Sequence, residues 1–480
     1  MATRYAFLSD HVDYMRWSDY AYSAGPTNLY DLPADTFINV NAPPWWLATW
    51  FSAPGHLGDR FAVTPMPSHS QCNYPPLAIY AFWLQGAAWH ALEKNVVTQS
   101  PASAVAAWFQ YTGGPITSRV ANTVTARAIN SALPIMADLL LALGVAGLSR
   151  KLAHPQRRHT LTLWAFGLTL LAPAVFIDSA FWSQTDAWIA SGLVWCLLLL
   201  VAERYGPAGV VYGATLLLKA QAVIFLPVLA LVFLSLAVRP TAPGHRGLPC
   251  LGRFLLGTVL TVGLLALPFM LAGAGGPEHG WLRWAYRAYV VPITTDFPFT
   301  TLKAFNVWWL DFTARGQTYE ALSAEARLLG LSKDLIGKML LSAAILLAGV
   351  LCVRRWRWTP PGWPAFAALV LLAAFLFPTR VHERYIYYCI PFLIATALTL
   401  PRWLPVLAAL LLVSTFELTW YLWYALPDAA PWEPAPTPLV KAWTVCLALL
   451  SLAGFAYALA AIGVNGPSNG ACGERDQVAP

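Results

Sequence analysis

Residues 363–385 read WPAFAALVLLAAFLFPTRVHERY, an apolar run of membrane character that ends abruptly in charged residues. The boundary carries Arg380, His382, Glu383 and Arg384 within five positions. Removing such groups from water is costly unless they are paired or line a polar cavity. One interpretation is a cationic helix end whose side chains reach back to water. We favour the other, a polar site at the outer mouth of a helical bundle that holds an anion.

The composition of the whole chain is that of a membrane bundle. Of 480 residues, 58% are hydrophobic and 11% are charged, against about 25% charged in soluble domains. The 23 Trp and 19 Tyr suit long membrane–water interfaces. The seven Cys are scattered singly, so neither a disulfide framework nor a zinc site is indicated. The net charge of +7 lies largely in short loops between apolar runs, and nucleic acid is not needed to explain it.

Apolar runs of roughly bilayer length recur along the chain and predict an all-α polytopic membrane protein. They fall near 128–149, 160–178, 187–202, 206–219, 220–238, 254–273, 336–353, 363–378, 385–400, 404–426 and 440–463. Several are a few residues short of the ~20 expected for a straight span. Their boundaries are therefore the least certain part of this prediction.

Basic residues between the runs predict the orientation in the membrane. They cluster at 150–158, 239–253, 354–357 and 402, and counting spans places all four loops on one side. Loops rich in Lys and Arg face the cytoplasm. The unusual polar residues then fall on the opposite, outer side.

This orientation divides the chain into successive parts. The predicted parts are an outer first loop (1–127), a membrane module (128–273), a second outer loop (274–335), C-terminal membrane helices (336–463) and a cytoplasmic tail (464–480). Residues 77–92 are apolar enough to span, but a span there would break the parity. We therefore expect 77–92 to form a helix along the outer interface.

Acidic residues gather near the start of the first outer loop. Asp10, Asp13 and Asp19 lie within ten positions. A carboxylate at the mouth of a dry bundle can act as the general base that activates a hydroxyl. The alternative is a solvated loop with ordinary charges, which we favour on these residues alone.

A short outer loop carries hydrogen-bonding groups beside an aromatic ring. Trp182, Gln184 and Asp186 are arranged as in many sugar-binding sites. The alternative is a helix start with Thr185 or Asp186 as its N-cap. Residues alone do not separate the two.

Lys219 lies in apolar sequence on both sides. A lysine there must reach water or find an anion, and a bound phosphate would satisfy it. Asp138 and Glu417 lie inside predicted spans, where we expect structural hydrogen bonds rather than chemistry.

Five motifs in order carry a resemblance to a known family. They are Asp10 with Tyr14 and Trp17; Asn73-Tyr74-Pro75-Pro76; Trp182-Ser183-Gln184-Thr185-Asp186; Lys219-Ala220-Gln221-Ala222; and His382-Glu383-Arg384-Tyr385. The combination resembles GT-C glycosyltransferases, in particular bacterial mannosyltransferase-like proteins related to the GPI second-mannose transferases. It is similar, more distantly, to the glucosyltransferases of dolichol-linked oligosaccharide assembly.

The resemblance implies a GT-C-like bundle and a reaction. Such enzymes move a sugar, here with mannose favoured, from a polyprenyl-phosphate carrier to a glycan, lipid or protein acceptor on the non-cytoplasmic face, with inversion. The implied base is Asp10, with Asp13 in reserve. Lys219, Arg380 and Arg384 would stabilise the leaving phosphate, and His382 would donate a further hydrogen bond. The implied location is a bacterial inner or plasma membrane.

No nucleotide-binding fingerprint is present, which agrees with a lipid-linked donor as co-substrate, and we expect no obligatory metal or other cofactor. Family members carry a span before the catalytic loop, so the true start is expected upstream of Met1. The alternative function is a polytopic lipid or sugar transporter or flippase. That class usually shows repeated halves and polar groups at the midplane.

Overall fold

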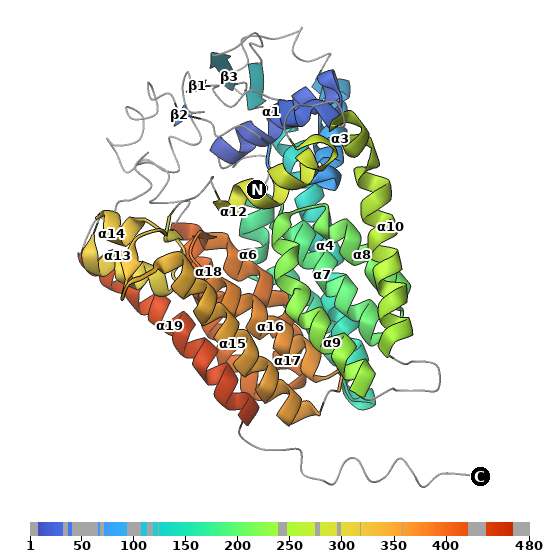
Figure 1. Cartoon of the computed structure of the whole chain (residues 1–480), viewed down its shortest axis with the longest axis vertical. Helices are drawn as coiled ribbons and strands as arrows, with labels where there is room; N and C mark the ends of the chain where they lie inside the picture. Colours follow the sequence, from blue (N-terminus) through green and yellow to red (C-terminus); the bar gives the residue numbers. More distant parts are fainter. Residues whose placement is uncertain are drawn as a thin grey trace.

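Each predicted apolar run forms a helix, or consecutive helices, in the computed structural model of the chain (Figure 1). The structure describes residues 8–31, 37–40, 66–67, 72–93, 107–112, 119–122, 124–238, 247–273, 279–294, 299–316, 318–357, 359–420 and 438–463. The bundle elements are α4 (Val124–Leu152), α5 (Arg158–Leu171), α6 (Pro173–Phe176), η3 (Ile177–Phe181), α7 (Asp186–Val201), α8 (Tyr205–Leu216), η4 (Ala220–Phe225), α9 (Leu226–Val238), α10 (Gly247–Gly273), α15 (Lys333–Trp356), α16 (Gly362–Leu376), η7 (Glu383–Cys389), α17 (Ile390–Thr399), η8 (Pro401–Trp403), α18 (Leu404–Trp420) and α19 (Pro438–Gly463). The tail predicted at 464–480 lies outside the described residues.

Several of these helices are long and apolar enough to cross a membrane. Within the described residues there are six, or up to seven if the bent pair Pro155–Leu171 and Pro173–Phe181 counts as one span. Two shorter apolar helices of the described chain, α7 and α16, also belong to the bundle. Every residue of α16 is buried, as expected for a helix that is hydrophobic all round and sits in the bundle centre. The chain is thus a mostly helical, multi-pass membrane protein.

The two ends of the bundle differ. Figure 1 shows α1 and α3 at one end and the C-terminal end of α19 at the other. Basic residues occupy the last turns of α4 (Arg150 and Lys151) and α15 (Arg354 and Arg355). Cations there also complement the helix dipoles. The end that carries α1 and α3 is called the α1 end below.

The residues predicted as a first outer loop form helices and a small sheet. The helical elements are α1 (Leu8–Ala24), η1 (Pro26–Asp31) and α3 (Pro76–Glu93). The helix predicted at 77–92 is α3, which is not among the candidate spans. The sheet, which the sequence analysis did not predict, has the order β2-β1-β3-β4 with β1 (Phe37–Val40), β2 (Met66–Pro67), β3 (Ala107–Thr112) and β4 (Arg119–Asn122).

A glycine lets α1 lie directly on α3. A Cβ at Gly86 would be 2.1 Å from the Ser18 carbonyl oxygen, so no larger residue fits at this crossing. Beside the crossing, Tyr14 and Trp17 of α1 pack on Phe82 of α3 with ring centroids 5.5 Å apart in each case. This contact fixes the position of the first turns of α1, which carry Asp10.

The residues predicted as a second outer loop hold the charged 379–385 stretch in place. They contain η5 (Gly280–Leu282), α11 (Arg283–Ala285), η6 (Tyr286–Val290), α12 (Val291–Thr294), β5 (Thr301–Leu302), α13 (Val307–Arg315), α14 (Tyr319–Leu322), β6 (Arg327–Leu328) and β7 (Leu331–Ser332). β5 pairs in parallel with β8 (Val381–His382). Buried Lys333, at the start of α15, donates to Asp311 Oδ2 at 2.5 Å and ties α13 to the bundle.

Candidate functional site

Two donors from one turn hold the Asp10 carboxylate. Trp182 Nε1 donates to Asp10 Oδ2 at 2.6 Å, and Gln184 Nε2 donates to the same oxygen at 2.5 Å. Ser183 between them has φ 61°, the left-handed conformation that turns both neighbours toward α1. Both of these hydrogen bonds fall on Oδ2 of Asp10.

Gln184 is itself fixed at its other end. Tyr14 OH donates to Gln184 Oε1 at 2.9 Å, and Tyr14 OH lies 3.1 Å from Tyr74 OH. Thr185 Oγ1 donates to Tyr74 OH at 3.3 Å. Protein groups therefore bond both ends of the Gln184 side-chain amide and fix its orientation toward Asp10.

A buried ion pair lies two residues after Gln184, at Asp186, the first residue of α7. Lys219 Nζ donates to Asp186 Oδ1 at 2.8 Å, and the two side chains are 9% and 0% exposed. Tyr388 OH donates to the same oxygen. Thr185, the N-cap residue of α7, makes no side-chain cap bond. The helix-cap interpretation is therefore wrong for Thr185, and Asp186 serves as the partner of Lys219.

Arg384 joins the ion pair to the Asp10 turn. Its Nε lies 3.2 Å from Asp186 Oδ2, and Nη1 donates to Glu383 Oε1 at 3.0 Å. Its guanidinium carbon lies 5.3 Å from the centre of the Trp182 ring, in cation–π range. Lys219 in turn sits 5.8 Å from the ring centres of both Tyr74 and Tyr385. We call Asp10, Trp182, Gln184, Asp186, Lys219 and Arg384 the charged cluster.

Burial sets the protonation of the groups on α1 and β8. Burial raises the pKa of Asp10 above its ordinary value, while Arg384 opposes the rise. Burial and the neighbouring Asp10 charge raise the pKa of Asp13 to about 7. Burial lowers the pKa of His382, and the nearby Arg384 adds to this effect. A carboxyl with a raised pKa is better matched to proton transfer near neutrality than an ordinary one.

Not every predicted site residue joins the cluster. Arg380 Nη2 donates to Glu325 Oε1 at 3.0 Å, and its Nε lies 3.9 Å from Asp334. Glu325 belongs to the second predicted outer loop and Asp334 to the start of α15. Their negative charges pair with Arg380, which therefore does not join the charged cluster. His382 lies at the cluster edge, with Nδ1 3.7 Å from Glu383 Oε2 and its ring 5.3 Å from that of Tyr385.

Asp13, the reserve base, lies one turn along α1 from Asp10. Its Oδ1 is buried, and no hydrogen bond to this atom occurs among the described residues. Asp19, the third acid of the group, lies 2.7 Å from His90 Nε2 on the far part of α3. Of the three acids, Asp10 alone is hydrogen-bonded to the 182–184 turn.

Asp138 and Glu417 make the structural bonds expected of them. Asp138 accepts from Ser179 and from Tyr387 OH, the latter at 3.2 Å. Glu417 Oε1 accepts from the Phe305 amide at 2.5 Å.

The sequence analysis missed Tyr388 and Asp178. Tyr388 lies four residues after Arg384 in η7, and both side chains contact Asp186. Asp178 is fully buried in η3, and neither carboxylate oxygen has a partner among the described residues. The backbone carbonyl oxygen of Asp178 accepts a hydrogen bond from the backbone N–H of Gln184 at 2.9 Å, which stabilises the 182–184 turn.

Within the described part of the chain, no group of three or more His, Cys, Asp and Glu side chains is placed to hold a metal ion. Comparison with known proteins adds no assignment: no protein-family model matches the chain, and no curated protein matches it. The chemistry is therefore argued from the charged cluster itself.

Proposed function

We propose that this protein is an integral-membrane glycosyltransferase that moves a sugar, with mannose favoured, from a polyprenyl-phosphate donor to an acceptor hydroxyl. One observation carries the proposal: Asp10, Asp186, Lys219 and Arg384, from four separate segments, meet in a single connected network. The network lies at the α1 end of the helices, where a lipid headgroup would be. The resemblance of the motifs to GT-C glycosyltransferases supplies the sugar and carrier class.

Asp10 is the base in this proposal. Its Oδ1 takes the proton of the acceptor hydroxyl as the acceptor oxygen bonds to the anomeric carbon. The bond from that carbon to the phosphate oxygen breaks, and polyprenyl phosphate leaves with the electron pair. Attack opposite the leaving group inverts the anomeric centre.

Lys219 and Arg384 stabilise the phosphate as it gains charge. The donor phosphate enters with one negative charge and leaves with two, while Asp10 becomes neutral by taking the proton. The total charge of the site is therefore unchanged, and the cations need only shift toward the phosphate. Preorganised cations in a site shielded from water are effective for this purpose.

The position of the cluster supports transfer over transport. A transporter places its substrate site near the bilayer midplane, at interrupted helices. Here the acids and cations sit at the first residues of α7 and η7 and at the α8–η4 junction, all at the α1 end.

The test is transfer from labelled polyprenyl-phosphate mannose by the purified protein in lipid nanodiscs. A labelled product that requires Asp10 and an acceptor fraction supports the proposal. Release of labelled donor to the opposite face of sealed vesicles, with no new glycoside, would instead identify a flippase. Replacing mannose by glucose in the donor tests the sugar separately from the reaction.

A further inference from the structure

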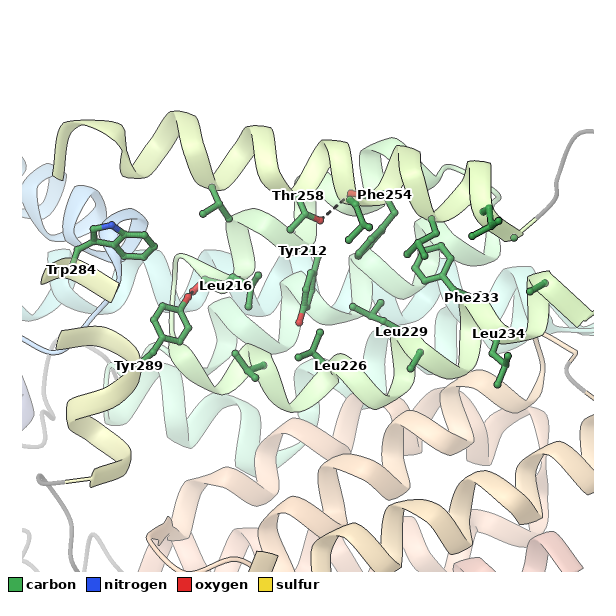
Figure 2. A pocket seen from close by; sticks show the side chains of 18 residues that line it. Tyr212, Leu216, Leu226, Leu229, Phe233, Leu234, Phe254, Thr258, Trp284 and Tyr289 are labelled. Carbon is green, nitrogen blue, oxygen red and sulfur yellow. Dashed lines mark hydrogen bonds between the residues drawn. The ribbon is translucent and has the colours of Figure 1, made fainter. Parts of the chain in front are cut away.

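Two cavities of the bundle differ in what they offer a ligand. The larger, about 820 Å³, is a groove between α8, α9 and α10 (Figure 2). Its hydroxyl groups are bonded within the protein, since Tyr212, Tyr289 and Thr258 each donate to a backbone carbonyl oxygen. The walls of the groove are therefore mostly hydrocarbon, which resembles the surrounding lipid and selects no particular ligand.

The smaller cavity, about 380 Å³, is a crevice with polar and apolar walls at the end of the bundle opposite α1. One wall is the turn that joins α4 to α5, and the other is the end of α17 with the first residue of η8. These segments are far apart in the sequence, and the packing of α17 on α4 and α5 brings them together. We call this cavity the α5–α17 crevice.

The rim of the α5–α17 crevice is polar and exposed. It carries His154, Gln156 and Arg157, whose side chains all offer N–H donors. Thr399 on the facing wall adds no donor, because its hydroxyl already donates within α17, to Ala395 O at 3.1 Å. No Asp or Glu is among the described residues that line the crevice. The rim therefore suits an anion.

The charge around the crevice has the same sign. Residues 150–158 include four Lys or Arg, and no acidic residue occurs at 139–177 or at 384–416. The C-terminal carbonyls of α4 and α17 lie at this end, and each helix end contributes roughly half a negative charge. Glu203, between α7 and α8, lies at the same end but does not line the crevice. The four cations outweigh these contributions, so the net charge at this end is positive.

The inner part of the crevice is apolar and continues along the outside of α5. Leu152, Leu161 and Leu398 line it and are half-buried. Three and ten residues beyond Leu161, on the same side of α5, Trp164 and Leu171 are 59% and 75% exposed. Ten residues of helix span about 15 Å, the depth of one leaflet in a hydrocarbon core of about 30 Å. An acyl chain can therefore lie along α5 while its headgroup occupies the crevice.

We propose that the α5–α17 crevice binds the phosphodiester headgroup of an anionic phospholipid from the adjacent leaflet. Arg157 can present two parallel N–H donors to the phosphate oxygens, and His154 and Gln156 add hydrogen bonds. Basic pockets between membrane helices are suited to such headgroups. A soluble phosphate ester would use the rim alone and leave the apolar face of α5 uncovered. The site does not depend on the proposed sugar transfer, because it lies at the opposite end of the bundle from the charged cluster.

A bound lipid would connect two parts of the bundle. Its phosphate contacts the α4–α5 turn, and its glycerol backbone contacts the end of α17. α17 directly follows η7, which carries Arg384. The lipid should therefore stabilise the packing of α17 against α4 and α5, and thermal unfolding can measure this effect.

Native mass spectrometry of the purified full chain measures how tightly it holds phosphatidylglycerol and phosphatidylcholine. The parent should prefer phosphatidylglycerol, and Arg157→Gln should weaken its binding by about tenfold or more, because a charge-assisted contact is lost. Arg253→Gln removes the same charge at an exposed position of α10 outside the crevice, and it should leave binding unchanged. Equal losses in the two variants would reduce the effect to net charge and overturn the site.

A second pair of variants tests the shape of the crevice at constant charge. Leu161→Trp fills the crevice and should weaken phosphatidylglycerol binding about tenfold, whereas Leu163→Trp adds the same ring at a 60% exposed position outside the lining. Phosphatidylglycerol should raise the unfolding temperature of the parent and of Leu163→Trp, but not of Leu161→Trp or Arg157→Gln. Arg157 is exposed, so Arg157→Gln should fold even if Leu161→Trp does not. Parent-level binding in a folded Leu161→Trp would contradict the proposal.

Competition separates a lipid from a soluble phosphate ester. Glycerophosphoglycerol carries the phosphodiester of phosphatidylglycerol without its acyl chains, so it should displace the lipid only at much higher concentration. Displacement at equal concentration would make the crevice a site for soluble phosphate esters and overturn the lipid assignment. Equal binding of phosphatidylglycerol and phosphatidylcholine would show that the anionic headgroup is not recognised, which would also overturn it.

Discussion

Trp182 and Gln184 both donate hydrogen bonds to the same oxygen of Asp10, the proposed base. Asp10→Asn keeps the size and the hydrogen-bonding shape of the side chain but removes most of its basicity. Transfer should fall about 10²–10⁴-fold while donor binding persists. Asp13→Asn should reduce transfer less, because Asp13 makes no bond to the 182–184 turn among the described residues. Parent-level transfer in Asp10→Asn together with loss in Asp13→Asn would move the base to Asp13.

The pH dependence tests the same carboxyl. In the proposed mechanism transfer needs Asp10 ionised, and burial raises the pKa of this carboxyl. Activity should therefore be lost as pH falls through that raised value. Gln184→Glu puts a second carboxylate beside Asp10, raises the Asp10 pKa further and should move the acid limb of the kcat/KM profile to higher pH. Gln184→Met, which removes the bond without adding charge, should move the acid limb upward by less than Gln184→Glu does, because it loses one hydrogen bond to the carboxylate and adds no repulsive charge. An acid limb that stays in place in Gln184→Glu would remove Asp10 as the titrating base.

Substitutions of Asp186 and Asp178 can be compared directly for their effect on stability, because both side chains are fully buried. Asp186 has bonds from Lys219 and Tyr388, whereas Asp178 has no side-chain partner among the described residues. Asp186→Asn strands a buried lysine and should cost about 3–5 kcal/mol in the free energy of unfolding. Asp178→Asn should cost little or stabilise. Thermal unfolding of both variants in the same detergent measures the difference, and equal losses would contradict the pairing seen here.

At the scale of elements, α1 carries the proposed base, Asp10, and the bundle carries the cations Lys219 and Arg384. Gly86→Ala drives a methyl group into the Ser18 backbone and should push α1 off α3. A displacement of about 1 Å can reduce a rate 10²-fold, while Lys219 and Arg384 keep their places in the bundle. Transfer should therefore collapse with donor binding retained. Ala88→Leu, at an exposed position of the same helix, is the control. Loss of donor binding in Gly86→Ala would mean that α1 also holds the bundle together.

The helices could be predicted from the sequence, because the length of an apolar run can be counted from consecutive residues. The cluster could be predicted only in part. Lys219 in apolar surroundings signalled the need for an anion, but the bond to Asp186 depends on how α7 packs against α8 and η4. The direction of Arg380 likewise depends on Glu325 and Asp334, which belong to another segment. The small sheet was missed because its pairing joins short segments far apart in the chain.

For the whole molecule, the prediction concerns orientation in the membrane. The basic ends of α4 and α15 should face the cytoplasm, and the charged cluster should face outward. In a background without the native cysteines, His382→Cys should react with a membrane-impermeant thiol reagent added outside intact cells. Arg150→Cys should react only after the cells are opened. The reverse pattern would invert the topology and put the site on the cytoplasmic side.

The Asp186–Lys219 pair also bears on how the protein is made. The two residues are 33 positions apart, so the ribosome delivers both well before Arg384 and the C-terminal helices exist. A single charge entering the membrane alone would be poorly tolerated, whereas a bonded acid and base insert as a neutral unit. The nascent chain can thus carry Asp186 and Lys219 as a neutral pair until the last helices are made. A chain that lacks either Asp186 or Lys219 would insert with one unpaired charge and would be a target for membrane-protein degradation, whatever its catalytic activity.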